Sequence, residues 1–158
     1  DQLRNLQIIG WTTILFGILL YISDKFKVEK KLDKNFTLKS AMIIGILQIF
    51  SLVPGVSRSG ITITAARILK FNRVDSAKIS FLLSIPTLAA VSFFGFKSLV
   101  TANNIDFSIL NLISIFLSFV FSLITIKFFL NYIKNFSLNI FVVYRIILGT
   151  FLLTIAYL

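Results

Sequence analysis

Apolar runs of two different lengths alternate along this chain, and these lengths restrict the fold more than any other feature. A helix needs about 20 apolar residues, at about 1.5 Å each, to cross the hydrocarbon core of a membrane. The runs of roughly this length cover residues 6–22, 76–99, 108–130 and 141–158. Two shorter runs lie between the first and second of them, on either side of a polar loop. The sequence therefore predicts four spanning helices and one interrupted segment.

The interrupted segment covers residues 40–70. Residues 40–53 and 60–70 have helical patterns, but they reach only roughly 21 and 16 Å, which is less than the ~30 Å of hydrocarbon. Irregular backbone at membrane depth is tolerated only where it is buried in protein or lines a wet cavity. We therefore predict a re-entrant helix–loop–helix hairpin with the polar loop at its tip.

The distribution of charge also favours a segment that turns back. A lysine-rich loop precedes the hairpin, with lysines at positions 25, 27, 30, 31, 34 and 39, and Lys70, Arg73 and Lys78 follow it. Basic clusters mark the cytoplasmic side, so both belong on the same side of the membrane. The polar turn at residues 101–107 is expected on the opposite side. The predicted fold class is an all-α integral membrane protein, a polytopic helix bundle with one re-entrant hairpin in a single domain over residues 1–158.

Composition limits the chemistry that this chain can perform. It contains no cysteine and no histidine, which excludes a thiol nucleophile, an imidazole base or a zinc site built from its own residues. Its six acidic residues fall in flanks or loops of the predicted helices, so we expect no metal ligands within this chain. The net charge of +10 comes largely from lysines clustered between apolar runs. Nucleic acid would need a continuous basic face, and this pattern is typical of membrane topology signals instead.

The polar loop reads PGVSRSGIT over residues 54–62. A charged side chain at this depth is costly and usually marks a ligand site. Arg58 supplies a fixed fork of donors, and the second short helix is expected to open at residues 60–62, where its dipole favours an anion. The hydroxyls and the flexible backbone that complete the predicted phosphate site come from Ser57, Ser59, Thr62, Gly55 and Gly60.

Alternatives remain open for this loop and its neighbours. Serine and glycine are common in membrane helices because they allow close packing, and Arg58 is what favours an anion site over packing. Gln48 is placed either to orient the loop through a hydrogen bond or to pack. Arg67 is placed either to extend the positive field of the loop or to snorkel to the interface, and we expect the latter. Arg145, in the last span, is expected outside the cavity rather than in it.

The sequence PGVSRSGITI closely resembles the second signature of the undecaprenyl-diphosphate phosphatase family, the bacitracin-resistance membrane phosphatases. The surrounding sequence agrees, since GILQ at 45–48 precedes the signature, and RVD at 73–75, ISFLLSIP at 79–86 and VYR at 143–145 follow it in order. The resemblance implies a multi-pass enzyme of the bacterial inner membrane, built from two inverted halves that each contribute a hairpin. It implies hydrolysis of undecaprenyl diphosphate to undecaprenyl phosphate and phosphate, which recycles the lipid carrier of peptidoglycan synthesis.

The resemblance also assigns roles to residues. Arg58 would act as the catalytic arginine that binds the diphosphate, with Ser57, Ser59 and Thr62 lining the same site. The family's first signature, a glutamate-rich stretch followed by a serine motif ending in histidine, is absent here. A divalent cation, Mg²⁺ or Ca²⁺, is therefore expected to find its ligands outside this chain.

Because the first signature is absent, we expect that this chain is the C-terminal part of a longer enzyme and that it is inactive alone. Its expected partners are the polyprenyl diphosphate, the N-terminal half and a second copy in a homodimer. Two alternative interpretations remain. The first is a secondary transporter or flippase of a phosphorylated lipid or anion, because such proteins contain broken helices like this hairpin. The second is a purely structural membrane subunit.

Overall fold

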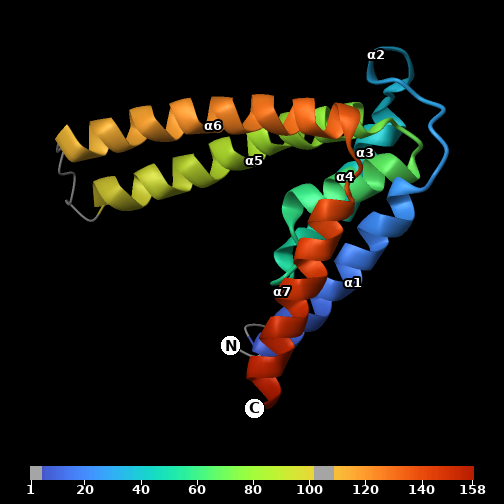
Figure 1. Cartoon of the computed structure of the whole chain (residues 1–158). Helices are drawn as coiled ribbons and strands as arrows, with labels where there is room; N and C mark the ends of the chain where they lie inside the picture. Colours follow the sequence, from blue (N-terminus) through green and yellow to red (C-terminus); the bar gives the residue numbers. More distant parts are fainter. Residues whose placement is uncertain (1–4, 102–108) are drawn as a thin grey trace.

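The structure, a computed structural model, describes residues 5–101 and 109–158 (Figure 1). These residues form seven α-helices and one short 3₁₀-helix, and no β-strand is found among them. The predicted all-α fold class is confirmed. The polar turn predicted at 101–107 lies, beyond its first residue, outside the described residues.

Helices α1 (Leu6–Asp24) and α7 (Asn139–Tyr157) form an antiparallel pair whose outer ends lie together near both chain termini (Figure 1). Glycines bring their backbones into contact. A Cβ atom added at Gly10 would lie 3.2 Å from the carbonyl oxygen of Gly149, and one added at Gly149 would lie 3.0 Å from that of Gly10. Small residues at such crossings allow the close packing that holds membrane helices together.

The segment predicted as a hairpin consists of α3 (Leu38–Gln48), the 3₁₀-helix η2 (Ile49–Leu52), a loop and α4 (Arg58–Ile68). The backbone N–H groups of Glu29 and Lys30 both donate to the carbonyl oxygen of Lys70 at 3.1 Å. The chain entering α3, which includes the short helix α2 (Leu32–Asn35), therefore lies beside the chain leaving α4, and the segment turns back on itself.

Helices α5 (Arg73–Thr101) and α6 (Ile109–Asn135) form a second long pair, which diverges from the α1–α7 pair (Figure 1). Helix α5 begins where Asn72 Oδ1 accepts a hydrogen bond from the backbone N–H of Asp75 at 2.7 Å, as expected of an N-cap. Its described residues up to Lys97, together with α1, α6 and α7, make four helices long and apolar enough to cross a membrane. The chain is a multi-pass membrane protein.

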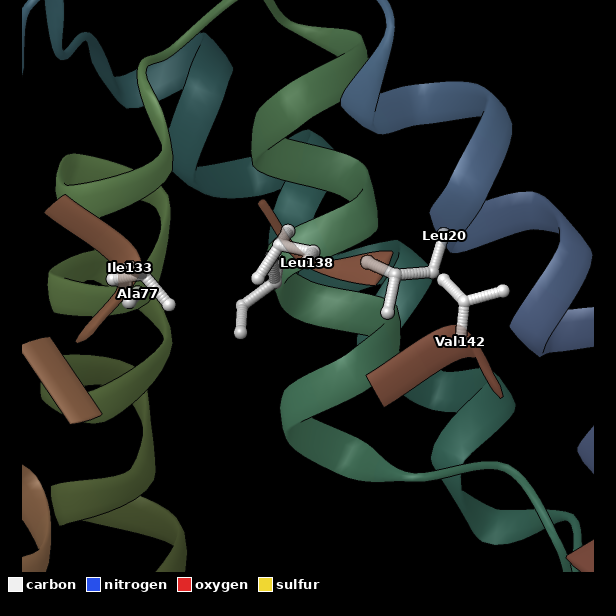
Figure 2. Packing of buried hydrophobic residues seen from close by; sticks show 6 residues of the cluster. Leu20, Ala77, Ile133, Leu138 and Val142 are labelled. Atoms are coloured by element: carbon white, nitrogen blue, oxygen red, sulfur yellow. The ribbon is translucent and has the colours of Figure 1, made fainter. Parts of the chain in front are cut away.

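A small apolar cluster joins the two helix pairs to α4. Figure 2 shows its side chains converging where the helices meet. Its members are Leu20, Ile63, Ala77, Ile133, Leu138 and Val142, all at most 6% exposed. Away from this junction α6 exposes its apolar side chains, and Ile133 is the one fully buried residue in its described part. That surface suits a hydrocarbon environment, in which helices satisfy their own backbone hydrogen bonds.

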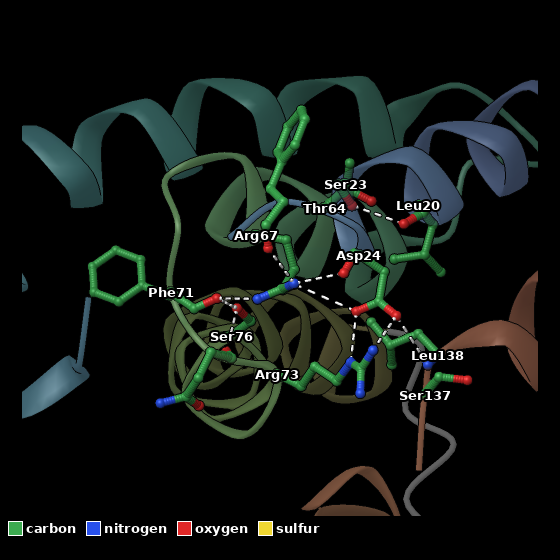
Figure 3. Close-up of polar contacts among 12 residues, drawn as sticks. Leu20, Ser23, Asp24, Thr64, Arg67, Phe71, Arg73, Ser76, Ser137 and Leu138 are labelled. Carbon is green, nitrogen blue, oxygen red and sulfur yellow. Dashed lines mark hydrogen bonds and ion pairs between the residues drawn. The ribbon is translucent and has the colours of Figure 1, made fainter. Parts of the chain in front are cut away.

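Asp24, the last residue of α1, connects this helix to α4, α5 and the start of α7 (Figure 3). Its carboxylate, predicted to lie in a polar flank, is buried and accepts hydrogen bonds from Arg73 Nε at 2.8 Å and Nη2 at 2.9 Å. Arg67 Nε lies 3.4 Å from the same carboxylate, and the backbone N–H of Leu138 donates to it at 3.4 Å.

Arg67 is 2% exposed, so the prediction that it snorkels to the interface is wrong. Its guanidinium donates to three backbone carbonyls, those of Asp24, Phe26 and Phe71. These carbonyls belong to chain segments that meet only in the folded protein. A buried cation with one carboxylate and several carbonyl partners loses less on leaving water than an isolated one, which explains why Arg67 stays inside.

Candidate anion site at the tip of the hairpin

A cavity of about 500 Å³ lies between α1, the hairpin tip and α7. Its polar lining comes from Thr13, Gly55, Ser57, Ser59, Gly60, Tyr144 and Arg145. Its apolar lining includes Ile9, Leu20, Ile63, Phe129, Phe141, Leu148 and Leu152. The cavity therefore has hydrogen-bond donors and a cation beside largely apolar walls.

The start of α4 supplies two of the hydroxyl groups of this cavity, those of Ser57 and Ser59. Ser57 is the N-cap of α4, and its Oγ accepts a hydrogen bond from the backbone N–H of Gly60 at 3.1 Å. The Oγ atoms of Ser57 and Ser59 lie 3.2 Å apart. First-turn N–H groups have no acceptor within their own helix, and the helix dipole favours negative charge there. Hydroxyls and a helix N-terminus at one point can hold the oxygens of an anion.

The loop before α4 is clamped from two sides. Gly55 has a backbone φ of +88°, a conformation that suits glycine. The hydroxyl of Thr12 on α1 donates to the carbonyl oxygen of Pro54 at 2.7 Å, and that of Thr13 to the carbonyl oxygen of Gly55 at 3.3 Å. From α7, Arg145 Nη2 donates to the same Gly55 oxygen at 2.9 Å. Both long helices of the first pair thus fix the position of the hairpin tip.

Comparison with known proteins finds relatives along nearly the whole chain. Residues 1–151 match the model of a family described as bacitracin resistance protein BacA. The chain belongs to this family. The resemblance inferred from the sequence around the loop is confirmed.

Curated members of the family named undecaprenyl-diphosphatase show how much of a relative this chain represents. It is 54% identical to the one from Pelagibacter ubique over 154 residues, which cover 98% of the chain and 60% of that relative. It is 44% identical to the one from Campylobacter curvus over 157 residues, covering 98% and 58%. It is 42% identical to the one from Teredinibacter turnerae over 152 residues, covering 96% and 57%. The chain thus spans no more than 60% of the length of these relatives.

The structure brings only some of the residues predicted from the family signature into the cavity. Ser57, Ser59, Gly55 and Gly60 line it. Arg58, the first residue of α4, is half-buried and does not line this cavity. The prediction that α4 opens at residues 60–62 is wrong, because Ser57 caps the helix and starts it at Arg58.

Two further predicted residues lie on the side of the hairpin that faces α5. Thr62 is 1% exposed, and its Oγ1 shares a hydrogen bond of 2.7 Å with Ser80 Oγ. Gln48 Nε2 donates to Thr87 Oγ1 at 3.4 Å, so the contact of this amide is with α5 and not with the loop. Both residues therefore hold the hairpin against α5.

Arg145 is the residue that sequence reasoning placed wrongly, since it was expected outside the cavity. It lies on α7, is 7% exposed and lines the cavity together with the α4 serines. A signal was present in the sequence, because an arginine within an apolar span usually faces a bundle interior or a wet cavity. Its partner could not be read from the sequence, since Gly55 lies 90 residues away.

The lining of this cavity does not fit a divalent cation. Metal ions of the Mg²⁺ or Ca²⁺ type need several oxygen ligands, mainly carboxylates. No carboxylate lines the cavity, and no cluster of three or more acidic or metal-binding side chains occurs in the part of the chain that the structure describes. The buried carboxylate of Asp24 is bound to Arg67 and Arg73 instead.

Proposed function

We propose that this chain is part of a bacterial inner-membrane phosphatase that hydrolyses undecaprenyl diphosphate to undecaprenyl phosphate and phosphate. The observation that carries this proposal is the cavity, which combines hydroxyls, a helix N-terminus and a guanidinium with apolar walls. Such a lining fits an amphiphile with a phosphorylated head and a hydrocarbon tail. The names of the relatives support this choice of substrate. The product would be the lipid carrier that peptidoglycan synthesis reuses.

In this proposal, the tip of the hairpin binds the diphosphate and stabilises charge during the reaction. Ser57, Ser59 and the N-terminus of α4 hold phosphate oxygens. Arg58 is the first residue of the same helical turn but does not line the cavity, so its role as the phosphate-binding cation rests on the resemblance of the loop to the family signature. A water oxygen bonds to the terminal phosphorus while the bond from that phosphorus to the bridging oxygen breaks. Charge then gathers on the leaving undecaprenyl phosphate, where fixed donors are most effective.

The remaining chemical groups would come from outside this chain. The cavity contains no carboxylate or imidazole that could take the proton from water. We assign the general base and the ligands of a Mg²⁺ or Ca²⁺ ion to the N-terminal half, which the length of the relatives supports. A second copy of the chain in a homodimer is a further proposed partner. The isolated chain is expected to be inactive.

Phosphate release from undecaprenyl diphosphate in detergent with Mg²⁺ tests this function. The activity of the chain alone is compared with that of the full-length protein. In the full-length protein, Arg58→Ala is compared with the control Lys78→Ala, which removes an exposed cation from α5. We expect activity only in the full-length protein, a loss of about 100-fold for Arg58→Ala, and little change for Lys78→Ala. Near-normal turnover by Arg58→Ala, or activity of the chain alone, would contradict the proposal. No hydrolysis by the full-length protein, with transfer of labelled lipid across sealed vesicles, would favour a flippase.

A further inference from the structure

The surroundings of Arg145 compensate its positive charge poorly. It is 7% exposed in the second turn of α7, and none of the ion pairs among the described residues includes it. A buried cation without a carboxylate is costly unless another negatively charged group or several acceptors compensate it. Its one hydrogen bond among the described residues is the bond from Nη2 to the carbonyl oxygen of Gly55. A guanidinium has five N–H donors, so most of the hydrogen-bond donors of Arg145 remain available for a ligand.

These remaining donors of Arg145 lie beside the hairpin tip. The stem of Arg145 lies against α1, since a Cβ atom added at Gly17 would be 3.2 Å from Arg145 Cβ. Its other end lies against the first turn of α4, because a Cβ atom added at Gly60 would be 2.5 Å from Arg145 Nη1. The same added atom would be 3.3 Å from Ser57 Oγ. Nη1 and the serine hydroxyl thus lie around one glycine, at the N-terminus of a helix.

We propose that Arg145 is a second phosphate-binding arginine of this site. One part of its guanidinium fixes the hairpin tip through the Gly55 carbonyl, and the other part donates to an oxygen of the bound diphosphate beside Ser57. The absence of a side chain at Gly60 leaves the space that Nη1 occupies. This role rests on the proposed function for the identity of the substrate. The anion chemistry itself, a diphosphate group held by hydroxyls and a guanidinium, rests on the geometry alone.

Direct binding of inorganic pyrophosphate to the full-length protein in detergent, measured by calorimetry, tests this role without requiring hydrolysis. Arg145→Lys keeps the charge and most of the stem, but one ammonium cannot hold the Gly55 carbonyl and a phosphate oxygen in the same bidentate manner. We expect roughly tenfold weaker binding for Arg145→Lys and roughly 30-fold weaker binding for Arg145→Gln. Lys134→Gln, which removes an exposed cation outside the cavity, should bind like the wild type.

A purely structural role for Arg145 makes a different prediction. Thr12→Val removes the clamp on the Pro54 carbonyl without changing any charge, so it perturbs the loop alone. If Arg145 contacts the anion, its glutamine variant must also reduce the dependence of affinity on ionic strength, whereas Thr12→Val must leave that dependence unchanged. Equal salt dependence in both variants would overturn the proposal.

The remaining outcomes separate this inference from the proposed function. Wild-type affinity in Arg145→Lys and in folded Arg145→Gln would overturn the inference, as would a wild-type protein that does not bind pyrophosphate. If the full-length protein releases no phosphate from undecaprenyl diphosphate but loses pyrophosphate affinity in the Arg145 variants, the proposed function fails and the anion site stands.

Discussion

Replacing Gly55 with alanine adds one methyl group at the tightest point of the hairpin tip. The backbone φ of +88° is unfavourable for any residue with a Cβ atom, at a cost of about 1–2 kcal/mol. The added carbon would also lie 2.6 Å from the carbonyl oxygen of Ile9 and closer still to the hydroxyl of Thr12. The first of these contacts is with backbone of α1, which cannot rotate away, so the loop itself must move.

Movement of the loop disrupts the bonds that hold it. The hydrogen bond from Thr12 to Pro54 contributes about 1 kcal/mol, and the charged one from Arg145 to Gly55 about 1.5–3 kcal/mol. With the backbone strain, Gly55→Ala is expected to lower the free energy of unfolding by about 4 kcal/mol. That is a large part of the 5–15 kcal/mol typical of folded proteins. Phosphate release should fall as well, because the N-terminus of α4 follows the loop.

Gly45→Ala provides the matched control. Gly45 lies on α3, and a Cβ atom added there would meet nothing within 4 Å. Alanine is the better helix former, so this change should leave stability unchanged or raise it by up to about 1 kcal/mol. Both variants of the full-length protein are unfolded in mixed micelles with increasing SDS, and phosphate release is measured on the folded samples. Equal stability of the two alanine variants would refute the reasoning from the backbone and the Ile9 carbonyl.

Two further predictions concern the helix packing that supports the site. Asp24→Asn should lower the free energy of unfolding by about 3–5 kcal/mol, since it leaves buried Arg67 without its carboxylate. Asp33→Asn, at an exposed position, should change it little, and equal SDS midpoints would contradict this. Gly149→Ala should cost about 1–3 kcal/mol, because the added carbon would lie 2.5 Å from Ile14 Cγ1 and 3.0 Å from the Gly10 carbonyl oxygen. Gly95→Ala, with open space around it, is its control.

The parts of the fold that could be predicted are those set by local sequence. Hydrophobic run length is a property of each segment, so it locates long helices and distinguishes them from the short arms of the hairpin. Helix ends depend on side chains that can be recognised, such as Ser57 capping α4, but choosing among several capping residues in one loop requires the folded geometry. The predicted end at residue 130 stopped short of Asn135, since α6 continues through a polar stretch with Lys134. Charge marked that stretch as interfacial but did not end the helix.

The parts that could not be predicted depend on pairs distant in the sequence. The contact between Arg145 and Gly55 requires that α7 pass the hairpin tip, and no local pattern indicates this. The same holds for Gln48, whose amide finds Thr87 on α5 rather than the nearby loop. Residue type indicated that these side chains needed partners, because polar groups in apolar segments do. It did not indicate which partners.

The two buried arginines in the described part of the chain separate a structural cation from one that binds a ligand. Arg67 has a carboxylate and three backbone carbonyls as partners, so its charge is already compensated within the fold. Arg145 is comparably buried, yet among the described residues it has one carbonyl and no carboxylate. Its burial therefore leaves positive charge uncompensated beside the α4 hydroxyls. An anion at that point would lower the energy of the folded protein and be bound more tightly for the same reason. Pyrophosphate should accordingly raise the SDS midpoint of the wild type, and raise it less in Arg145→Gln.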